Sequence, residues 1–248
     1  MHHLGTIFAR GLLPRTFRTF SSTRSFSSNL GVRPKVVVGM SGGVDSSVAA
    51  LLLKQQGFDV HGVFIRSWDS REESGSYTKK GKFSGNCAER DFEMVQKICG
   101  QLGIPCSMVD FVKEYWNEVF LPFLDDNERG NTPNPDILCN RFLKFDACVN
   151  YAIKDIGADF VATGHYAKLG RTGGENGCRR GSPQLQLLQA VDDSKDQTYF
   201  LSGVPLEMFE RVLFPLADIR KSTVKQLASD EGLLSATKKE NVYYILYS

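Results

Sequence analysis

The chain has 248 residues, of which 42% are hydrophobic and 23% are charged, as in an ordinary globular protein. This composition excludes a wholly disordered or collagen-like chain, and no apolar run approaches the roughly 18 residues of a membrane-spanning helix. The formal net charge is only +2, so nucleic acid would have to be bound by a local basic patch.

Residues 1–34 differ in composition from the rest of the chain. They hold five Arg and no Lys, Asp or Glu, which leaves 25 of the 30 basic residues and all 28 acidic residues to the remainder. A segment rich in Arg, Ser and Phe without acids is typical of an organellar transit peptide, although a merely disordered basic tail is the alternative. We expect a mitochondrial transit peptide here, with the plastid as the second destination, outside the fold.

The first predicted strand is the β-branched run Lys35–Met40, which leads into a Gly/Ser loop at 41–47 and a helix at 48–56. Glycines let an anion approach the backbone closely, and free N–H groups at a helix start point at it. The loop has neither the Lys of a Walker A loop nor the spacing of a dinucleotide site. Instead Ser41–Ser46 resembles the PP-loop of ATP pyrophosphatases. The resemblance implies ATP binding, with Asp45 as a candidate Mg²⁺ ligand.

Strands and helices alternate along the rest of the chain. We predict strands at 58–68, 106–111 and 160–163, helices at 86–103, 114–124, 208–211 and 221–231, and a hairpin with arms at 166–169 and 184–191. This alternation predicts an α/β fold, a parallel sheet with helices on both faces. Ligands in such sheets bind at the carboxyl ends of the strands, where the 41–47 loop lies.

One of the six cysteines has an unusual setting. No C-x-x-C pair or zinc-finger spacing occurs, so reduced thiols inside a cell compartment are expected. Cys139 follows a proline-stiffened segment and directly precedes a predicted helix, with Arg141 and Lys144 nearby. Helix N-termini and cations favour a thiolate, so we expect a lowered pKa and the most reactive of the six thiols. Asp136, three residues upstream, is placed to handle a proton.

The alternative role of a cysteine is that of a small buried hydrophobic side chain. It fits Cys99, Cys106 and Cys148, which lie in or beside apolar stripes.

Five segments occur in a fixed order: Gly39–Ser47, Phe64–Trp68, Asn134–Asn140, Thr163–Ala167 and Lys195–Leu201. With them, the chain from about residue 35 to 239 resembles the tRNA-specific 2-thiouridylases of the bacterial and mitochondrial type. The resemblance implies a PP-loop fold of the adenine-nucleotide α-hydrolase kind. It also implies that ATP adenylates the C2 oxygen of wobble uridine 34 in tRNA, and that sulfur from a persulfide donor protein replaces this oxygen to give 2-thiouridine.

The resemblance assigns roles to individual residues. The implied ATP-binding residues are Gly39, Met40, Ser41, Gly42, Gly43, Val44, Asp45, Ser46, Ile65 and Gly164. The implied tRNA-binding residues are Asn134, Pro135 and Asp136 at the extruded base, with His165, Lys195, Asp196 and Gln197 on the tRNA. Cys139 and Asp136 are the implied catalytic residues.

The end of the chain departs from this family. Relatives carry a second cysteine beyond residue 239, which holds the persulfide and forms a disulfide with the first, followed by two β-rich domains. Residues 240–248 contain no cysteine, so we expect a truncated form with weak sulfur transfer, in which Cys87, Cys106 or Cys148 would have to substitute. The alternatives are an isoform that only binds ATP or tRNA, and another PP-loop synthetase, which Asn134–Asn140 disfavours.

Overall fold

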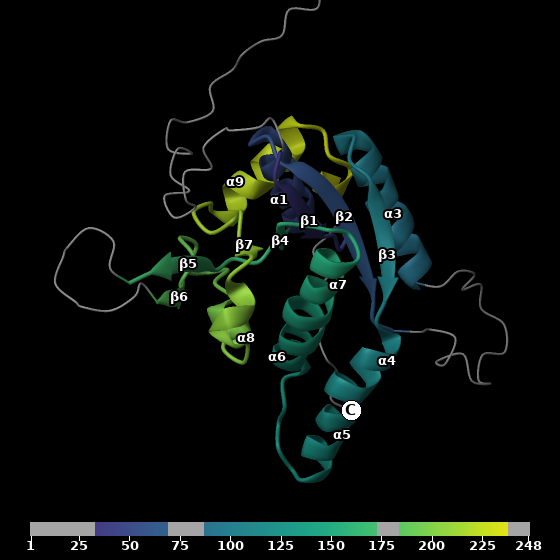
Figure 1. Ribbon diagram of the computed structural model, residues 1–248, viewed down its shortest axis with the longest axis vertical. Helices are drawn as coiled ribbons and strands as arrows, with labels where there is room; N and C mark the ends of the chain where they lie inside the picture. Colours follow the sequence, from purple (N-terminus) through teal and green to yellow (C-terminus); the bar gives the residue numbers. More distant parts are fainter. Residues whose placement is uncertain (1–32, 69–86, 173–183, 238–248) are drawn as a thin grey trace, which may run out of the picture. The chain divides into compact units, whose positions relative to one another are not determined.

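The computed structural model describes residues 33–68, 87–172 and 184–237 (Figure 1). Residues 1–32 of the predicted transit peptide (1–34), the final segment 240–248 and residues 173–183 between the predicted hairpin arms lie outside these ranges. Within them, five parallel strands form one sheet in the order β3-β2-β1-β4-β7. The strands are β1 (Lys35–Gly39), β2 (Asp59–Arg66), β3 (Cys106–Asp110), β4 (Phe160–Ala162) and β7 (Val212–Leu213). The expected parallel α/β fold is confirmed.

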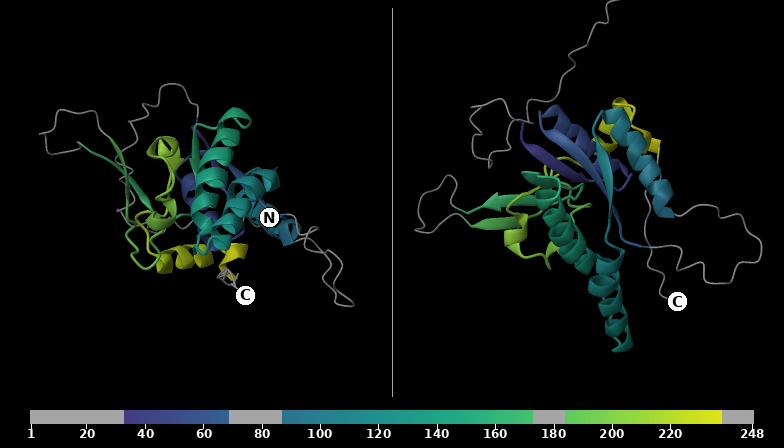
Figure 2. Two further views of the ribbon diagram at one scale, coloured as in Figure 1. Left: turned by 90° about the horizontal axis from the view of Figure 1, so that it is seen from below. Right: turned by 45° about the vertical axis from the view of Figure 1, so that its right-hand side comes forward.

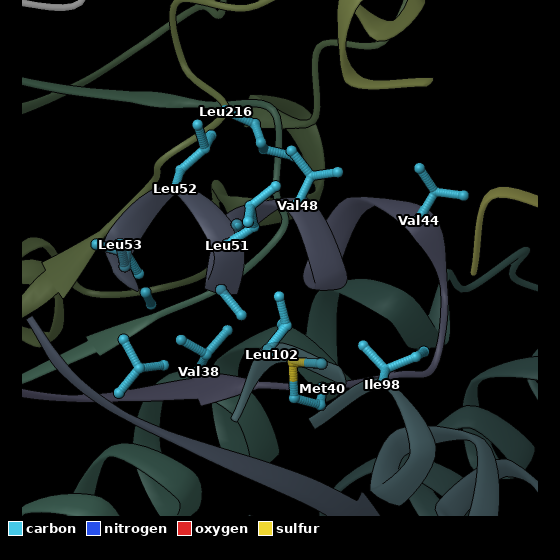
Figure 3. Close-up of a cluster of buried hydrophobic side chains, with 14 of the residues drawn as sticks. Val38, Met40, Val44, Val48, Leu51, Leu52, Leu53, Ile98, Leu102 and Leu216 are labelled. Carbon is cyan, nitrogen blue, oxygen red and sulfur yellow. The ribbon is translucent and has the colours of Figure 1, made fainter. Parts of the chain in front are cut away.

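The central strand β1 divides the core into two layers, because successive side chains of a strand point to opposite faces. Val36 and Val38 pack with α1 (Val44–Gln55), α3 (Cys87–Leu102) and α9 (Lys221–Asp230), the layer shown in Figure 3. Val37 packs on the other face with the helical segment that ends in α7 (Cys148–Lys154). Figure 2 shows these two helical layers on either side of the sheet, as the sequence predicts.

Two long helical segments each change their winding along their length. The first runs through α4 (Val112–Tyr115), the π-helical η2 (Trp116–Phe120) and α5 (Leu121–Glu128). The second runs through α6 (Pro135–Leu138), the π-helical η3 (Cys139–Ala147) and α7, with helical backbone angles at both junctions. π-Helical turns are rare and frequently mark functional sites.

The remaining elements are short. An antiparallel hairpin pairs β5 (Lys168–Arg171) with β6 (Leu185–Leu188), which confirms the predicted hairpin. Helix α8 (Thr198–Leu201) and strand β7 are too short for a periodic pattern and were not predicted. The predicted helix 208–211 is a 3₁₀ turn, η4 (Leu206–Phe209), and a second 3₁₀ turn, η5 (Leu234–Thr237), ends the described chain. No helix of the described ranges is long and apolar enough to cross a membrane.

Two helices begin a full turn or more earlier than the sequence predicts. Helix α1 begins at Val44 rather than residue 48, because Gly43 has extended backbone angles and serves as its N-cap. Helix α6 begins at Pro135, where a proline is favoured because the first helical N–H needs no partner. Cys139 therefore lies one turn inside a helix, and the prediction that it directly precedes the helix is wrong.

Candidate functional site

A cavity of about 710 Å³ opens at the carboxyl ends of the strands. The strand order reverses direction between β1 and β4, and such a switch point is where α/β sheets bind their ligands. The cavity has the size of a small-molecule site. It brings together residues far apart in the sequence, among them Met40, Ser41, Asp45, Ile65, Asp136, Cys139, Gly164, His165 and Gln197.

The loop after β1 is folded back on the start of α1. Gly42 has a φ of +71°, which glycine adopts without strain. The hydroxyls of Ser46 and Ser47 donate to the Gly43 carbonyl at 3.2 and 2.7 Å, and the Ser41 N–H donates to the Ser46 hydroxyl at 3.2 Å. The first N–H groups of a helix have no helical partner. Those of α1 lie beside the cavity wall, which is the arrangement of an anion site.

Gly164 holds the end of β4 against this helix start. A Cβ atom on Gly164 would lie 2.8 Å from the Ser46 nitrogen and 2.9 Å from the Asp45 carbonyl carbon. Both are backbone atoms, so any side chain here forces the two elements apart. Gly164, which the family resemblance assigns to ATP binding, therefore also sets the position of the loop.

Asp45 is bound by two side chains that sequence reasoning did not select. Lys221, the first residue of α9, places its Nζ 2.7 and 2.6 Å from the two carboxylate oxygens, and the Tyr166 hydroxyl donates to one of them at 2.8 Å. Lys221 is 9% exposed, and its backbone N–H donates to the Asp192 carboxylate. The loop lacks a lysine of its own, and the fold supplies one from 176 residues away. No local signal in the sequence marks this pairing.

Asp45 does not form a metal site with its neighbours. Both of its oxygens contact the Lys221 ammonium. Among the described residues, no three His, Cys, Asp or Glu side chains are grouped to hold a metal ion. The donor set therefore does not fit a Mg²⁺ ion held by the protein alone.

The opposite wall of the cavity carries the thiol. Asp136, Cys139, Lys144 and Cys148 line it from one helical segment. Burial raises the pKa of Cys139, the Lys144 charge lowers it, and Asp136 raises it further. The expected lowering of this pKa is wrong, because Cys139 lies inside the helix and desolvation outweighs the nearby cation.

The described cysteine side chains differ in burial. All four described thiols are free. Burial raises the pKa of both Cys99 and Cys148 to about 12, and Cys99 also contacts Cys106. Cys139 is only partly buried, so it is the more accessible thiol of the cavity wall. Cys87 has no described side chain.

Several residues assigned to tRNA have structural contacts of their own. Asn134 caps α6 by accepting from the Asp136 N–H at 3.0 Å, and Pro135 starts that helix. The Asp196 carboxylate accepts from the Ala190 N–H at 2.9 Å. Gln197 lines the cavity and accepts from the Tyr166 N–H at 3.0 Å. Lys195 is exposed. Neither Lys195 nor Asn134, Pro135 or Asp196 is part of the cavity wall. Their contact with RNA stays a prediction.

His165 is buried at the cavity wall. Its Nδ1 lies 2.8 Å from the Thr163 hydroxyl, and its ring packs against the rings of Phe145 and Phe214. Burial and the charge of Lys144 lower the pKa of His165 well below 6.5. The imidazole is therefore neutral in the folded chain at neutral pH.

Because the pKa of His165 is lowered in the folded chain, we expect the protein to lose stability in mild acid. Below pH 6.5 the unfolded chain protonates His165 and the folded chain does not, so the unfolded state binds more protons. We expect the free energy of unfolding to fall by up to about 1.4 kcal/mol per pH unit there. Urea unfolding between about pH 5 and 7.5 measures it. His165→Gln should flatten the profile more than His61→Gln, the other histidine with a lowered pKa. Equal slopes in the parent and His165→Gln would contradict this assignment.

A parallel sheet with a candidate anion site at its switch point defines a class of α/β proteins. Within this class, the family model of the tRNA methyl transferase HUP domain matches residues 34–244. The chain belongs to this family.

The curated relatives agree with this assignment. The chain is 47% identical over 207 residues to a Bacillus licheniformis protein named tRNA-specific 2-thiouridylase MnmA, a match that covers 84% of this chain and 50% of that one. Proteins of the same name from Limosilactobacillus fermentum and Staphylococcus aureus are 50% and 46% identical, with 84% and 86% of this chain and 50% and 52% of theirs covered. The chain spans about half the length of the curated relatives it matches.

Solved structures are more distant. A 4-thiouridine synthetase in complex with RNA and ATP has a TM-score of 0.47 and 16% identity, covering 82% of this chain and 42% of that one. An NMN synthetase from Francisella tularensis has a TM-score of 0.46 and 15% identity, covering 85% and 67%.

Proposed function

We propose that this chain is the nucleotide-binding and thiol-bearing region of a tRNA 2-thiouridylase. In this function the C2 oxygen of wobble uridine 34 is adenylated and then replaced by sulfur. The observation that carries the proposal is that one cavity joins the loop Ser41–Ser46 to the wall with Asp136 and Cys139. The two steps of the reaction need these two groups within reach of one substrate atom.

The loop side of the cavity fits the phosphates of ATP. The helix start of α1 and the Ser41 and Ser46 side chains supply hydrogen-bond donors, and Gly164 keeps them in place. Lys221 neutralises Asp45, so this carboxylate does not repel an anion in the loop. ATP supplies the adenylyl group that turns the uridine oxygen into a leaving group.

The other side of the cavity fits the base. An enzyme that modifies a base takes it out of its stack and holds it against aromatic side chains. Trp68 and Tyr115 line the cavity with their rings 5.8 Å apart, next to Asp136 and Cys139. The outer sulfur of a persulfide on the donor protein forms the bond to C2, and AMP leaves with the electrons of the broken C–O bond. The Cys139 thiolate then attacks the inner sulfur, so that a disulfide forms between Cys139 and the donor cysteine, and the electrons of the broken S–S bond stay on the sulfur of 2-thiouridine.

Magnesium belongs to this proposal only as a companion of the nucleotide. The ion usually binds through one or two carboxylates together with substrate phosphates. Because Lys221 already holds both oxygens of Asp45, no step is assigned to a metal held by the protein.

Adenylation tests the proposed function directly. The chain is incubated with ATP and an anticodon stem–loop that carries uridine 34, and pyrophosphate release and the mass of the RNA are measured. We expect pyrophosphate and an AMP–RNA adduct, and 2-thiouridine when inorganic sulfide is added as the nucleophile. A stem–loop with cytidine 34 is the matched control. ATP binding without any adduct would reduce the function to nucleotide binding, and equal reaction of both RNAs would contradict the assigned base.

We also propose that residues 1–34 direct the chain to mitochondria. Their Arg-rich, acid-free composition supports this proposal. A fluorescent reporter fused behind residues 1–40 should enter mitochondria, and the same fusion with the five Arg changed to Gln should not. A reporter found in plastids would favour the plastid as the destination. A reporter spread through the cytosol would contradict the proposal.

A further inference from the structure

The π-helical winding of η3 decides which basic residue faces the cavity beside Cys139. In this winding an N–H bonds to the carbonyl five residues back, as the Cys148 N–H does to the Leu143 carbonyl. Residues five apart therefore lie one turn above each other, whereas in an α-helix they would lie about 140° apart. Cys139 and Lys144 are five apart, and both line the cavity.

Arg141, the other nearby cation, is directed elsewhere. It is exposed, and its guanidinium lies over the Phe142 ring at 5.0 Å. It is not part of the cavity wall. Arg141 and Lys144, the two cations near Cys139 in the sequence, therefore differ in position: Lys144 lines the cavity and Arg141 does not.

Lys144 also lacks a counter-ion in the described part of the chain. Among the described residues, the Arg and Lys side chains of the cavity wall are Arg66 and Lys144, and Arg66 is paired with Asp110. No described carboxylate lies within ion-pair distance of Lys144. Its charge acts on two neutral groups, lowering the pKa of Cys139 and of His165. An ammonium group at a cavity wall without an acidic partner is placed to meet an anion that forms there.

We propose that Lys144 is the counter-ion of the Cys139 thiolate, and that the π-helical winding of η3 exists at this site to place it there. Ionisation breaks the S–H bond, the sulfur keeps the electron pair, the proton passes to solvent, and Lys144 stays protonated. This assignment rests on the proposed function only for the use that is made of the thiolate.

The other described groups around Cys139 either disfavour ionisation of its thiol or have no effect on it. Asp136, on the preceding turn, raises the pKa of the thiol. Burial raises the pKa of Tyr115, and the charges of Cys139 and Asp136 raise it further. His165 is neutral and adds no charge. Among the described groups around Cys139, Lys144 is therefore the one whose charge favours the thiolate.

The pH dependence of Cys139 alkylation tests this role. The chain is treated with a limiting amount of iodoacetamide at about pH 6.5 to 10, and the modified Cys139 peptide is quantified by mass spectrometry. In Lys144→Met the rate profile should move up by about one pH unit, so the rate below the pKa falls about tenfold. Lys144→Arg should retain the parent profile, because it keeps the charge.

Arg141→Met is the matched control, since it removes the same charge two residues from Cys139. Its profile should stay at the parent position. Equal shifts in Arg141→Met and Lys144→Met would show a net-charge effect and overturn the assignment, as would an unchanged Lys144→Met profile. If Lys144→Met fails to give the parent circular-dichroism spectrum, Lys144→Gln takes its place. The assay uses neither ATP nor RNA, so its outcome is independent of the adenylation result.

Discussion

Replacing Lys221 by Met is expected to abolish measurable ATP binding and to destabilise the fold. The Lys221 side chain is 11% exposed, and its ammonium contacts both carboxylate oxygens of Asp45 beside the Ser41–Ser46 loop. Without it a partly buried carboxylate faces the site of an anion, and breaking such a pair costs about 3 kcal/mol or somewhat less at this exposure. We expect ATP affinity to fall by at least about a hundredfold, a change of 2.7 kcal/mol or so. Titration calorimetry and urea unfolding measure the two effects.

Two further variants separate charge from structure. Lys225→Met removes the same charge one turn along α9 at an exposed position, and ATP affinity should stay at the parent value. The double variant Asp45→Asn with Lys221→Met removes both partners, which is less costly than stranding one charge. It should regain much of the lost stability and, because no carboxylate then faces the anion, part of the lost ATP affinity. Unchanged ATP affinity in Lys221→Met would show that the ion pair does not serve the loop.

Much of the fold could be predicted from the sequence, because the residue patterns that indicate the central strand and the main helices are local and strong. The run Lys35–Met40 is a buried strand by its β-branched residues, and the helices on both sides have clear apolar stripes. Strand β7 has only two residues, and α8 has four, so neither shows a period. Their positions are set by tertiary contacts, such as the Val161 N–H donating to the Arg211 carbonyl.

The candidate site is only partly predictable for a similar reason. The loop Ser41–Ser46 and the segment Asn134–Asn140 are continuous motifs, and both reach the cavity. Lys221 has no motif around it, and its role depends on where α9 begins against α1. The error at Cys139 has a local cause, since two prolines suggested a loop where Asn134 and Pro135 in fact start a helix. That shift of one turn reverses the expected direction of the thiol pKa.

The replacement of Gly164 by Ala is expected to have the second largest effect, although it adds one methyl group. The new Cβ would lie 2.8 and 2.9 Å from backbone atoms of Ser46 and Asp45, closer than real Cβ atoms come, and backbone cannot rotate away as a side chain does. Either β4 or the start of α1 must move, at a cost of about 2 kcal/mol for overpacking. The movement displaces the helix start that faces the cavity, so ATP affinity should fall at least about tenfold.

Gly100→Ala is the matched control, because its Cβ meets nothing within 4 Å and lies in helix α3, where Ala is favoured over Gly. We expect that control to be as stable as the parent or slightly more stable, with unchanged ATP affinity. Parent-like stability and affinity in Gly164→Ala would mean that β4 and α1 are not in the close contact on which the loop geometry depends.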